Sequence, residues 1–281
     1  MEKAIKKYWP IFLLPTLCAF VIGFVVPFAQ GAYLSLCKFQ TVDKATFIGL
    51  SNYVKAFADT QFTHSFWLTV RFTVVSTLLI NLFALTVALL LTRQIGGTNL
   101  FRTVFFMPNL IGGIVLGYIW QILINCVLSL LGKPLLALNA TYGYWGLIIL
   151  MCWQQIGYMM IIYIAGLQAI PNDYIEAATI DGANSWQTLW KVKLPNLMPS
   201  ITICLFLSLT NSFKLFDQNL ALTNGEPSKM SEMLALNIFN TFYGRAGYEG
   251  VGQAKAVIFF ILVAAIALTQ NYLTRRKEVQ Q

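Results

Sequence analysis

Long apolar stretches are the feature of this sequence that most limits what it can fold into. A helix needs about 20 mostly apolar residues to cross the roughly 30 Å hydrocarbon layer of a membrane. Six stretches of the chain are long enough, at residues 11–36, 66–91, 104–127, 144–167, 200–223 and 254–273. The sequence therefore predicts an all-α, polytopic membrane protein with about six transmembrane helices.

Composition points to the same class of protein. Hydrophobic residues make up 57% of the 281 residues and charged residues only 11%, and the mean hydropathy is +0.66. Such a chain has too little polar surface to be an ordinary soluble protein. The first stretch is too long for a simple secretory signal and lacks a small-residue cleavage site, so we expect it to be the first span. We expect one transmembrane domain over residues 1–281.

Lys and Arg residues beside the spans predict the orientation, because cytoplasmic flanks collect them. With the N-terminus inside, the inner flanks hold Lys3, Lys6, Lys7, Arg93, Arg102, Lys191, Lys193, Arg275, Arg276 and Lys277. The outer flanks hold Lys38, Lys44, Lys55, Lys133, Lys229, Arg245 and Lys255. Both tails are basic and the number of crossings is even, so we expect both termini to be cytoplasmic. The net charge of +8 requires no nucleic acid, since basic flanks on anionic lipid explain it.

Motifs for catalysis or nucleotide binding are absent from the sequence. It has no GxxxxGK[ST] loop, no GxSxG and no HExxH. The five cysteines lie in or beside the apolar stretches, with no CxxC and no nearby histidine. We therefore predict no enzyme activity, no metal site and no cofactor bound by this chain. If the protein uses energy, another chain must supply it.

A hydrophilic segment, residues 168–199, separates the fourth and fifth stretches. Pro171 suits the first turn of a helix, and Asp173 places negative charge at the positive end of the helix dipole. Gly182 can adopt the left-handed conformation that ends a helix and turns the chain. The first part of the segment is thus predicted to be a cytoplasmic helix followed by a turn.

A second short helix is expected after that turn. Asn184 and Gln187 have the spacing of a capping box, and Pro195 is expected to end the helix. The alanines and acidic residues of the segment suit the docking of a partner protein, because small side chains allow a close approach and carboxylates accept hydrogen bonds. An amphipathic linker lying on the membrane surface would have a similar pattern. These physical arguments leave both alternatives open.

The residues Glu176-Ala177-Ala178, followed at fixed spacing by Gly182, Val192 and Leu194-Pro195, resemble the EAA loop of permease subunits in ATP-binding-cassette (ABC) importers. The resemblance implies the type I ABC importer permease fold. In that family the loop forms a coupling helix that sits in a groove of the cytoplasmic ATPase. By position, a coupling role is implied for Glu176, Ala177, Ala178, Asp181 and Gly182.

Two stretches resemble the carbohydrate-importing, maltose-transporter type of this family: "FKLFDQNLALTNGEP" from Phe213 and "GLQAIPNDYIEAATIDGA" from Gly166. The resemblance implies a permease that moves a sugar or oligosaccharide across the cytoplasmic membrane of a bacterium or archaeon by alternating access. It also implies partners: a second, similar but distinct permease subunit, two cytoplasmic ATPase subunits that bind ATP and Mg²⁺, and an extracytoplasmic sugar-binding protein.

Polar residues in the fourth and fifth stretches are candidates for a substrate path. A charge at bilayer depth costs about 2.5–3.5 kcal/mol on insertion scales, so it usually faces a cavity or a partner. Lys214 and Asp217 are three residues apart, hence on one helical face, and Asn211 precedes Lys214 by three. Gln155 joins them by resemblance, because the corresponding spans form the maltose-type sugar site, and Trp153 could stack on a sugar ring. The alternatives are a structural ion pair between helices or near the outer headgroups, and ordinary polar contacts between helices.

Other functions remain open from the sequence. Within the importer class, the cargo could be an amino acid, or a sugar phosphate attracted by Lys214. An ATP-independent transporter would need its own ion-coupling residues or an internal repeat, which we do not find. A membrane-embedded enzyme would need catalytic carboxylates or a metal site at one interface. The EAA spacing argues against both of these last classes.

Overall fold

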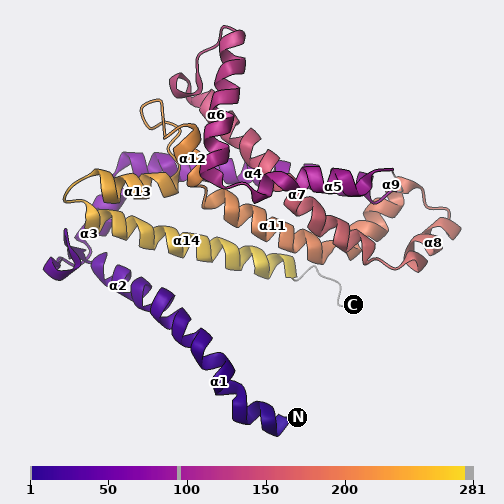
Figure 1. Cartoon of the computed structure of the whole chain (residues 1–281), viewed down its shortest axis with the longest axis horizontal. Coiled ribbons are helices and arrows are strands. Elements are labelled where there is room, and N and C mark those ends of the chain that lie inside the picture. The colour runs from indigo at the N-terminus through magenta and orange to yellow at the C-terminus, as the bar shows by residue number, and fades with distance from the viewer. Residues whose placement is uncertain (1, 94–95, 276–281) are drawn as a thin grey trace. The chain divides into compact units, whose positions relative to one another are not determined.

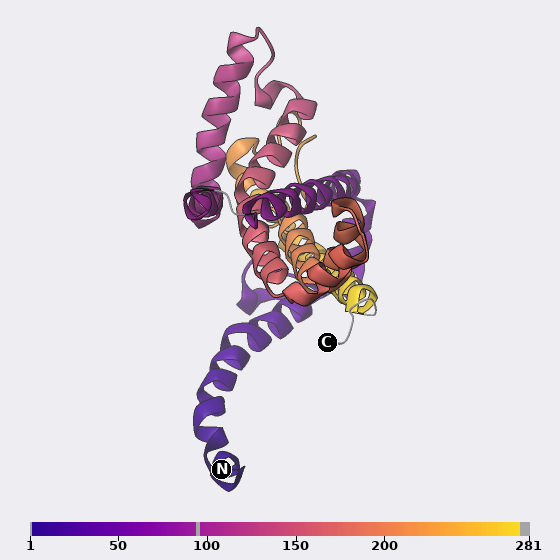
Figure 2. The ribbon, with the colours of Figure 1, turned by 90° about the vertical axis from the view of Figure 1, so that its right-hand side faces the viewer.

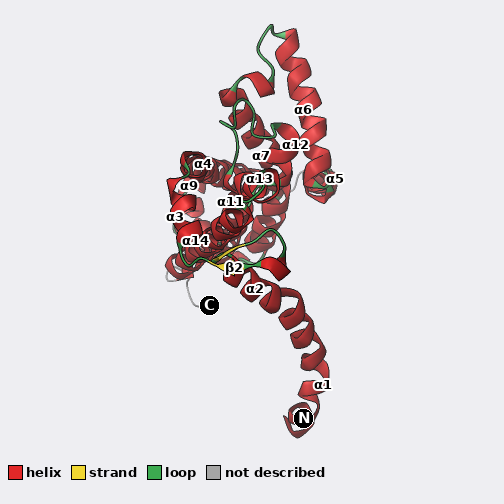
Figure 3. Cartoon of the chain, turned by 90° about the vertical axis from the view of Figure 1, so that its left-hand side faces the viewer, coloured by secondary structure: helices red, strands yellow, loops and turns green. Residues whose placement is uncertain are grey.

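A computed structural model of the chain describes residues 2–93 and 96–275, and helices make up nearly all of its regular structure (Figure 1, Figure 3). The α-helices are α1 (Glu2–Phe20), α2 (Val26–Leu34), α3 (Ser51–Ala58), α4 (Thr60–Leu91), α5 (Thr98–Phe106), α6 (Gly113–Leu130), α7 (Ala140–Gln168), α8 (Asn172–Ile180), α9 (Ser185–Thr188), α10 (Leu194–Asn196), α11 (Met198–Phe213), α12 (Asp217–Leu222), α13 (Leu234–Gly244) and α14 (Glu249–Arg275). Shorter elements are the π-helical turns η1 (Val21–Val25) and η5 (Leu189–Lys193), the 3-10 helices η2 (Val42–Lys44), η3 (Met107–Leu110) and η4 (Leu136–Leu138), and the antiparallel strands β1 (Cys37–Lys38) and β2 (Thr46–Phe47).

Five helical segments of the described chain are long and apolar enough to cross a membrane, and a bent pair makes a sixth candidate. The five are Leu13–Leu34, Thr60–Leu91, Gly113–Leu130, Ala140–Gln168 and Glu249–Leu273. The bent pair joins Ser185–Asn196 to Met198–Phe213 at an angle of 71°. The prediction of an all-α protein with about six spans is confirmed. The orientation stays a prediction, and two of the cations that support it, Arg276 and Lys277, lie outside the described residues.

The third apolar stretch, residues 104–127, is not one helix as predicted. Helix α5 ends at Phe106, η3 follows with Pro108 in its first turn, and α6 begins only at Gly113. Proline has no N–H to donate, and its ring clashes with the carbonyl of the preceding helical turn. The span therefore shifts toward the C-terminus and runs to Leu130.

The fifth stretch, residues 200–223, was also predicted as one helix and is broken. Helix α11 ends at Phe213, and α12 begins at Asp217. Between them the backbone leaves the helical region, with φ −90° and ψ 13° at Lys214 and φ −124° and ψ −62° at Phe216. The prediction that Lys214 and Asp217 share one helical face is therefore wrong. Backbone at bilayer depth can be irregular only where it is buried in protein or borders a watery cavity.

Contacts divide the chain into two compact units. The first consists of Met1–Thr60 and Ile238–Phe260, and the second of Gln61–Asn237 and Ile261–Gln281. The single domain expected over residues 1–281 stays a prediction.

A buried cation organises the first unit. The side chain of Lys255 is fully buried, and its ammonium donates hydrogen bonds to Asp59 Oδ2 at 2.7 Å and to Thr241 Oγ1 at 2.8 Å. Arg245 lies 3.7 Å from the same carboxylate oxygen. A buried charge is tolerated when an opposite charge and further hydrogen bonds accompany it. Asp59 therefore links the junction of α3 and α4 to α13 and α14.

The core of the second unit forms around α7, which packs against α5 and α11. Polar contacts tie α4 to this core. Ser76 Oγ donates to Ser212 Oγ at 2.9 Å, and Asn81 Nδ2 donates to Ser208 Oγ at 2.8 Å. Tyr163 of α7 donates to Asn81 Oδ1 at 2.7 Å. Such hydrogen bonds between helices stabilise bundles in lipid, where apolar side chains gain little by leaving the hydrocarbon.

Close approach of α5 to α7 depends on one glycine. A Cβ atom placed on Gly157 would collide with the backbone carbonyl of Phe105, and backbone cannot move aside as a flexible side chain can. Glycine at this position therefore sets the spacing of the two helices.

We predict that Gly157→Ala lowers the free energy of unfolding by at least about 1–3 kcal/mol, because the added methyl overpacks the contact with Phe105. Thermal unfolding of the purified protein in detergent measures this. The matched control is Gly23→Ala, because Gly23 has open space where its Cβ would lie. Equal melting temperatures for the two variants would contradict the assigned packing.

Candidate functional site

A polar cavity of about 440 Å³ lies at the break between α11 and α12. Its lining residues are Asn109, Met151, Gln154, Gln155, Asn211, Lys214, Leu215, Phe216, Asp217 and Gln218. Four elements and the break supply them. Asn109 belongs to η3, the methionine and two glutamines to α7, Asn211 to α11, and Asp217 and Gln218 to α12, while the other three residues form the break. All of these elements belong to the second unit.

Side-chain amides connect α7 to both sides of the break. Gln218 Nε2 donates to Gln154 Oε1 at 2.7 Å, and Gln154 Nε2 donates to the carbonyl of Ile111 at 3.2 Å. Asn211 Nδ2 lies 3.5 Å from Gln155 Oε1, at the long limit for a hydrogen bond. Gln154 and Gln155 are both mostly buried. The amides are thus held in place, while amide groups of the cavity retain further donors and acceptors.

The structure brings the four predicted path residues, Gln155, Asn211, Lys214 and Asp217, to this one cavity. Their role stays a prediction. The alternative of an ion pair does not hold in the described part of the chain, because Lys214 and Asp217 form no salt bridge there. Trp153, by contrast, does not line the cavity. It is 41% exposed and packs edge-on against Trp120, with ring centres 5.4 Å apart.

Sequence reasoning missed Asn109 and Gln218. Asn109 directly follows Pro108, and a proline with a polar neighbour inside an apolar stretch could have marked a helix break. Gln218 lies four residues after Lys214 and seven after Asn211, so even a continuous helix would have placed it on the same stripe. This spacing was a signal that could have identified the residue.

The chemistry of the cavity is that of hydrogen bonding with balanced charge. It contains five amide side chains, one cation and one carboxylate. One positive and one negative charge give no net attraction for an ionic solute. The amides, the ammonium and the carboxylate can donate to and accept from hydroxyl groups at several points. The site therefore suits a neutral, hydroxyl-rich solute.

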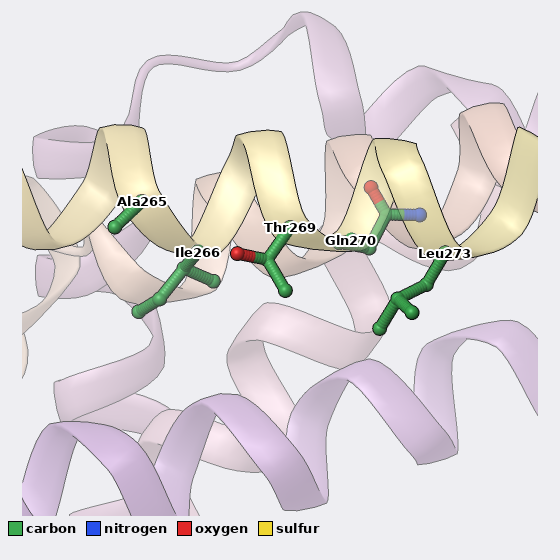
Figure 4. A pocket seen from close by; sticks show the side chains of 5 residues that line it. All are labelled: Ala265, Ile266, Thr269, Gln270 and Leu273. Carbon is green, nitrogen blue, oxygen red and sulfur yellow. The ribbon is translucent and has the colours of Figure 1, made fainter.

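A second hollow lies along α14 and differs in character (Figure 4). It is lined by Ala265, Ile266, Thr269, Gln270 and Leu273. All five come from a single helix, and the lining is almost wholly apolar. Such a face suits packing against lipid or another apolar surface and offers little for a polar solute.

The hydrophilic segment forms the predicted helix, turn and helix, at the right-hand end of Figure 1, the side that Figure 2 turns toward the viewer. Gly182 has φ +76°, and the N–H groups of Gly182 and Ala183 donate to the carbonyls of Thr179 at 3.1 Å and Ala178 at 2.9 Å. These are the two hydrogen bonds of a Schellman motif, which glycine favours because it has no Cβ to clash at positive φ. The predicted role of Gly182 in ending α8 is confirmed. Pro171 lies one residue before α8 rather than within its first turn.

The predicted capping box is present. Gln187 N–H donates to Asn184 Oδ1 and Asn184 N–H donates to Gln187 Oε1, both at 2.9 Å. Pro195, however, does not end the second helix as predicted. The π-helical turn η5 widens the chain just before it, and helix continues to Asn196. Pro195 then stands in the first turn of α10, a position at which proline is tolerated.

The segment presents its predicted coupling residues to the outside. Glu176, Ala177, Asp181 and Gly182 are exposed, and Ala178 is half-buried. Large apolar side chains accompany them, with Ile180 86% exposed and Trp186 67% exposed. Exposed apolar groups gathered on a polar segment are typical of a surface that binds another protein.

Comparisons with known proteins agree with this geometry. Residues 56–279 match the family described as "Binding-protein-dependent transport system inner membrane component". The chain is 44% identical to the probable starch degradation products transport system permease protein AmyD of Thermoanaerobacterium thermosulfurigenes, over 97% of this chain and 95% of that protein. It is 30% identical to the multiple sugar-binding transport system permease protein MsmF of Streptococcus mutans, over 99% of each.

Among solved structures, the chain is similar to a crystal structure of a bacterial ABC transporter involved in the import of the acidic polysaccharide alginate. The TM-score is 0.82, with 22% identity over 98% of both chains. At this identity the likeness shows the fold alone.

The fold and the family match together define a multi-pass membrane permease of the ABC transporter class. This chain belongs to the family of binding-protein-dependent transport system inner membrane components. The predicted resemblance to EAA-loop permeases is confirmed.

The geometry predicts that Lys214 and Asp217 act independently on stability. We expect Lys214→Gln and Asp217→Asn to show a coupling energy below about 0.5 kcal/mol in a double-mutant cycle, because the two groups form no salt bridge. Unfolding of the purified protein in detergent gives the four free energies.

The pair Asp59 and Lys255 is the matched control, because its atoms are 2.7 Å apart. Its coupling energy should exceed about 1 kcal/mol, as expected for a pair with a buried member. A comparable coupling energy between Lys214 and Asp217 would mean that the two residues do form a structural ion pair. It would then count against their role as substrate-path residues.

Proposed function

We propose that this chain is a permease subunit of an ABC importer that moves a neutral sugar or oligosaccharide into the cell by alternating access. The observation that carries the proposal is the polar, charge-balanced cavity at the break between α11 and α12. Five amides there can hydrogen-bond the hydroxyls of a sugar. The names of the relatives AmyD and MsmF, a permease for starch degradation products and a permease of a multiple sugar-binding transport system, favour the same class of cargo.

The exposed segment from α8 to α9 is proposed to bind an ATPase subunit and to move with it when ATP is bound and hydrolysed. Its EAA-type residues Glu176, Ala177, Ala178, Asp181 and Gly182 are placed on the surface, beside the apolar Ile180 and Trp186. A small-residue surface with acidic groups suits a groove on another protein. Movement of this segment would be passed to α11 through the bent connection at Leu197. Rocking of packed helices around a fixed site is a known form of alternating access.

The proposed assembly contains a second, similar but distinct permease subunit, two cytoplasmic ATPase subunits and an extracytoplasmic sugar-binding protein. ATP and Mg²⁺ would bind to the ATPase subunits. A binding-protein partner is supported by the family description, which names binding-protein-dependent transport. We propose a bacterial or archaeal cytoplasmic membrane, with both termini and the α8–α9 segment on the cytoplasmic side.

Substitutions in the cavity test the cargo. We predict that Asn211→Ala, Gln155→Ala and Lys214→Gln change which unlabelled sugars compete with uptake, with affinities weakened about two- to tenfold, because each variant removes a hydrogen-bonding group. Competition is measured on cells or proteoliposomes that take up a labelled maltooligosaccharide. Abundance of the subunit should be unchanged.

The control for these variants is Asn99→Ala, which removes an exposed amide from the start of α5. An unchanged competition profile in all three cavity variants would remove them from the path. Stronger competition by a sugar phosphate than by the parent sugar would favour a sugar phosphate as the transported solute, with its phosphate attracted by the charge of Lys214.

Substitutions in the α8–α9 segment test coupling. We predict that Glu176→Lys and Gly182→Pro abolish uptake while the protein stays in the membrane. The first reverses a charge at the proposed contact, and the second cannot reach φ +76°, because proline is fixed near −65°. Uptake and ATP hydrolysis are measured on the assembled transporter.

Asp43→Lys is the matched control for Glu176→Lys, because Asp43 is exposed and is expected on the outer side. Uptake at the wild-type rate in both α8–α9 variants would exclude a coupling role. Loss of uptake in Asp43→Lys as well would mean that charge reversal acts through assembly.

A further inference from the structure

A second polar cavity lies beside the α8–α9 segment and is separate from the proposed sugar path. Its volume is about 980 Å³, within the range that holds ligands the size of a lipid headgroup. The lining residues are Leu89, Thr92, Arg93, Leu167, Gln168, Ile170, Asn172, Ile175, Thr179, Ala183, Asn184, Ser185, Thr188, Leu189 and Lys193. It lies where two predicted spans end, since α4 ends at Leu91 and α7 at Gln168. The cavity is therefore at a membrane surface.

The charged side chains that line this cavity are all positive. Arg93 and Lys193 line it, and no Asp or Glu residue does. In the described part of the chain neither cation forms a salt bridge. Two positive charges that share a cavity repel each other unless an anion is present.

Helix ends do not cancel this charge. The C-terminal ends of α4 and α7 carry partial negative charge, but Asn172, which starts α8, also lines the cavity, and a helix N-terminus carries partial positive charge. The two cations therefore leave the cavity positive, which favours an anion such as a phosphodiester.

The remaining lining divides into two kinds of surface. Gln168 and Ser185 offer an amide and a hydroxyl donor for phosphate oxygens, whereas the hydroxyls of Thr92 and Thr188 donate to the carbonyls of Leu89 and Asn184 and can accept from glycerol hydroxyls. Leu89, Leu167, Ile170, Ile175 and Leu189 offer an apolar surface at the ends of the spans. This combination fits a molecule with a phosphate and an apolar part.

We propose that this cavity binds a phosphate-bearing anion through Arg93 and Lys193, its source being the headgroup of an anionic phospholipid. Basic pockets between transmembrane helices are known to bind such headgroups. Asn184 and Thr188 belong to the segment proposed to contact an ATPase, so an occupant would touch a moving part.

The test uses the full chain purified in detergent and native mass spectrometry with added lipid. Wild-type protein should retain dioleoyl phosphatidylglycerol in preference to dioleoyl phosphatidylcholine. Arg93→Gln and Lys193→Gln should each weaken retention of phosphatidylglycerol about fivefold, the loss expected for one basic contact with an anionic lipid. Lys191→Gln is the matched control, because Lys191 is exposed, lies two residues away on η5 and does not line the cavity.

A second experiment distinguishes the two possible sources of the anion, a phospholipid headgroup and free phosphate. Titration with inorganic phosphate alone should leave the retained phosphatidylglycerol in place. Displacement of the lipid by millimolar phosphate would keep the site and assign it to free phosphate. Equal retention of both lipids, or an equal loss in Lys191→Gln, would overturn the proposal.

A measurement on wild-type protein covers the case in which a variant fails to fold. Photoreactive phosphatidylglycerol should label residues at the end of α4 or in residues 167–193. Labelling confined to other segments would contradict the site. Neither result depends on the ATPase partner, so failure here leaves the proposed transport function standing.

Discussion

The fold of the second unit is governed by the need to satisfy backbone polar groups where a span is interrupted. Between Phe213 and Asp217 the helix stops inside an apolar stretch, and free N–H and C=O groups are costly in hydrocarbon. Part of the cost is met locally, as the N–H groups of Lys214 and Leu215 donate to Thr210 and Ser212 at 3.2 and 3.3 Å. The buried amides of α7 supply polar surroundings on the facing side. The break and the polar cavity therefore coincide, since the residues of the break line the cavity.

Small residues on α6 allow α12 to pack closely against it, and this packing places residues of α12 in the wall of the cavity. A Cβ on Gly117 would lie 2.5 Å from Ala221 Cβ, and one on Gly113 would lie 2.9 Å from Asp217 Cβ. Both distances are shorter than real carbon contacts, so larger side chains would push α12 away. Gln121 completes the contact, as its Nε2 donates to the carbonyl of Leu222 at 2.9 Å. Close helix packing thus positions Asp217 and Gln218 at the cavity.

The sequence predicts elements whose signals are local and misses those set by tertiary contacts. The helix–turn–helix segment was predictable, because Gly182 and the Asn184–Gln187 capping box act within a few residues. The break after Phe213 was not, because the side chains that contact the residues on its two sides, Gln154 and Gln155, lie more than fifty residues away in the chain. Asn211 and Lys214 were found because charges and amides are rare in apolar stretches, and Gln218, seven residues after Asn211, could have been found by the same local signal.

The central claim is that this permease works as part of an ATP-driven sugar importer. The most direct measurement is to purify the chain in mild detergent from its native membrane, identify the proteins that accompany it and measure ATP hydrolysis of the eluate. The account predicts an ATPase with nucleotide-binding motifs, a second six-span subunit, and hydrolysis that rises when a sugar-loaded binding protein is added. A protein that is recovered without any ATPase and still transports solute would contradict it.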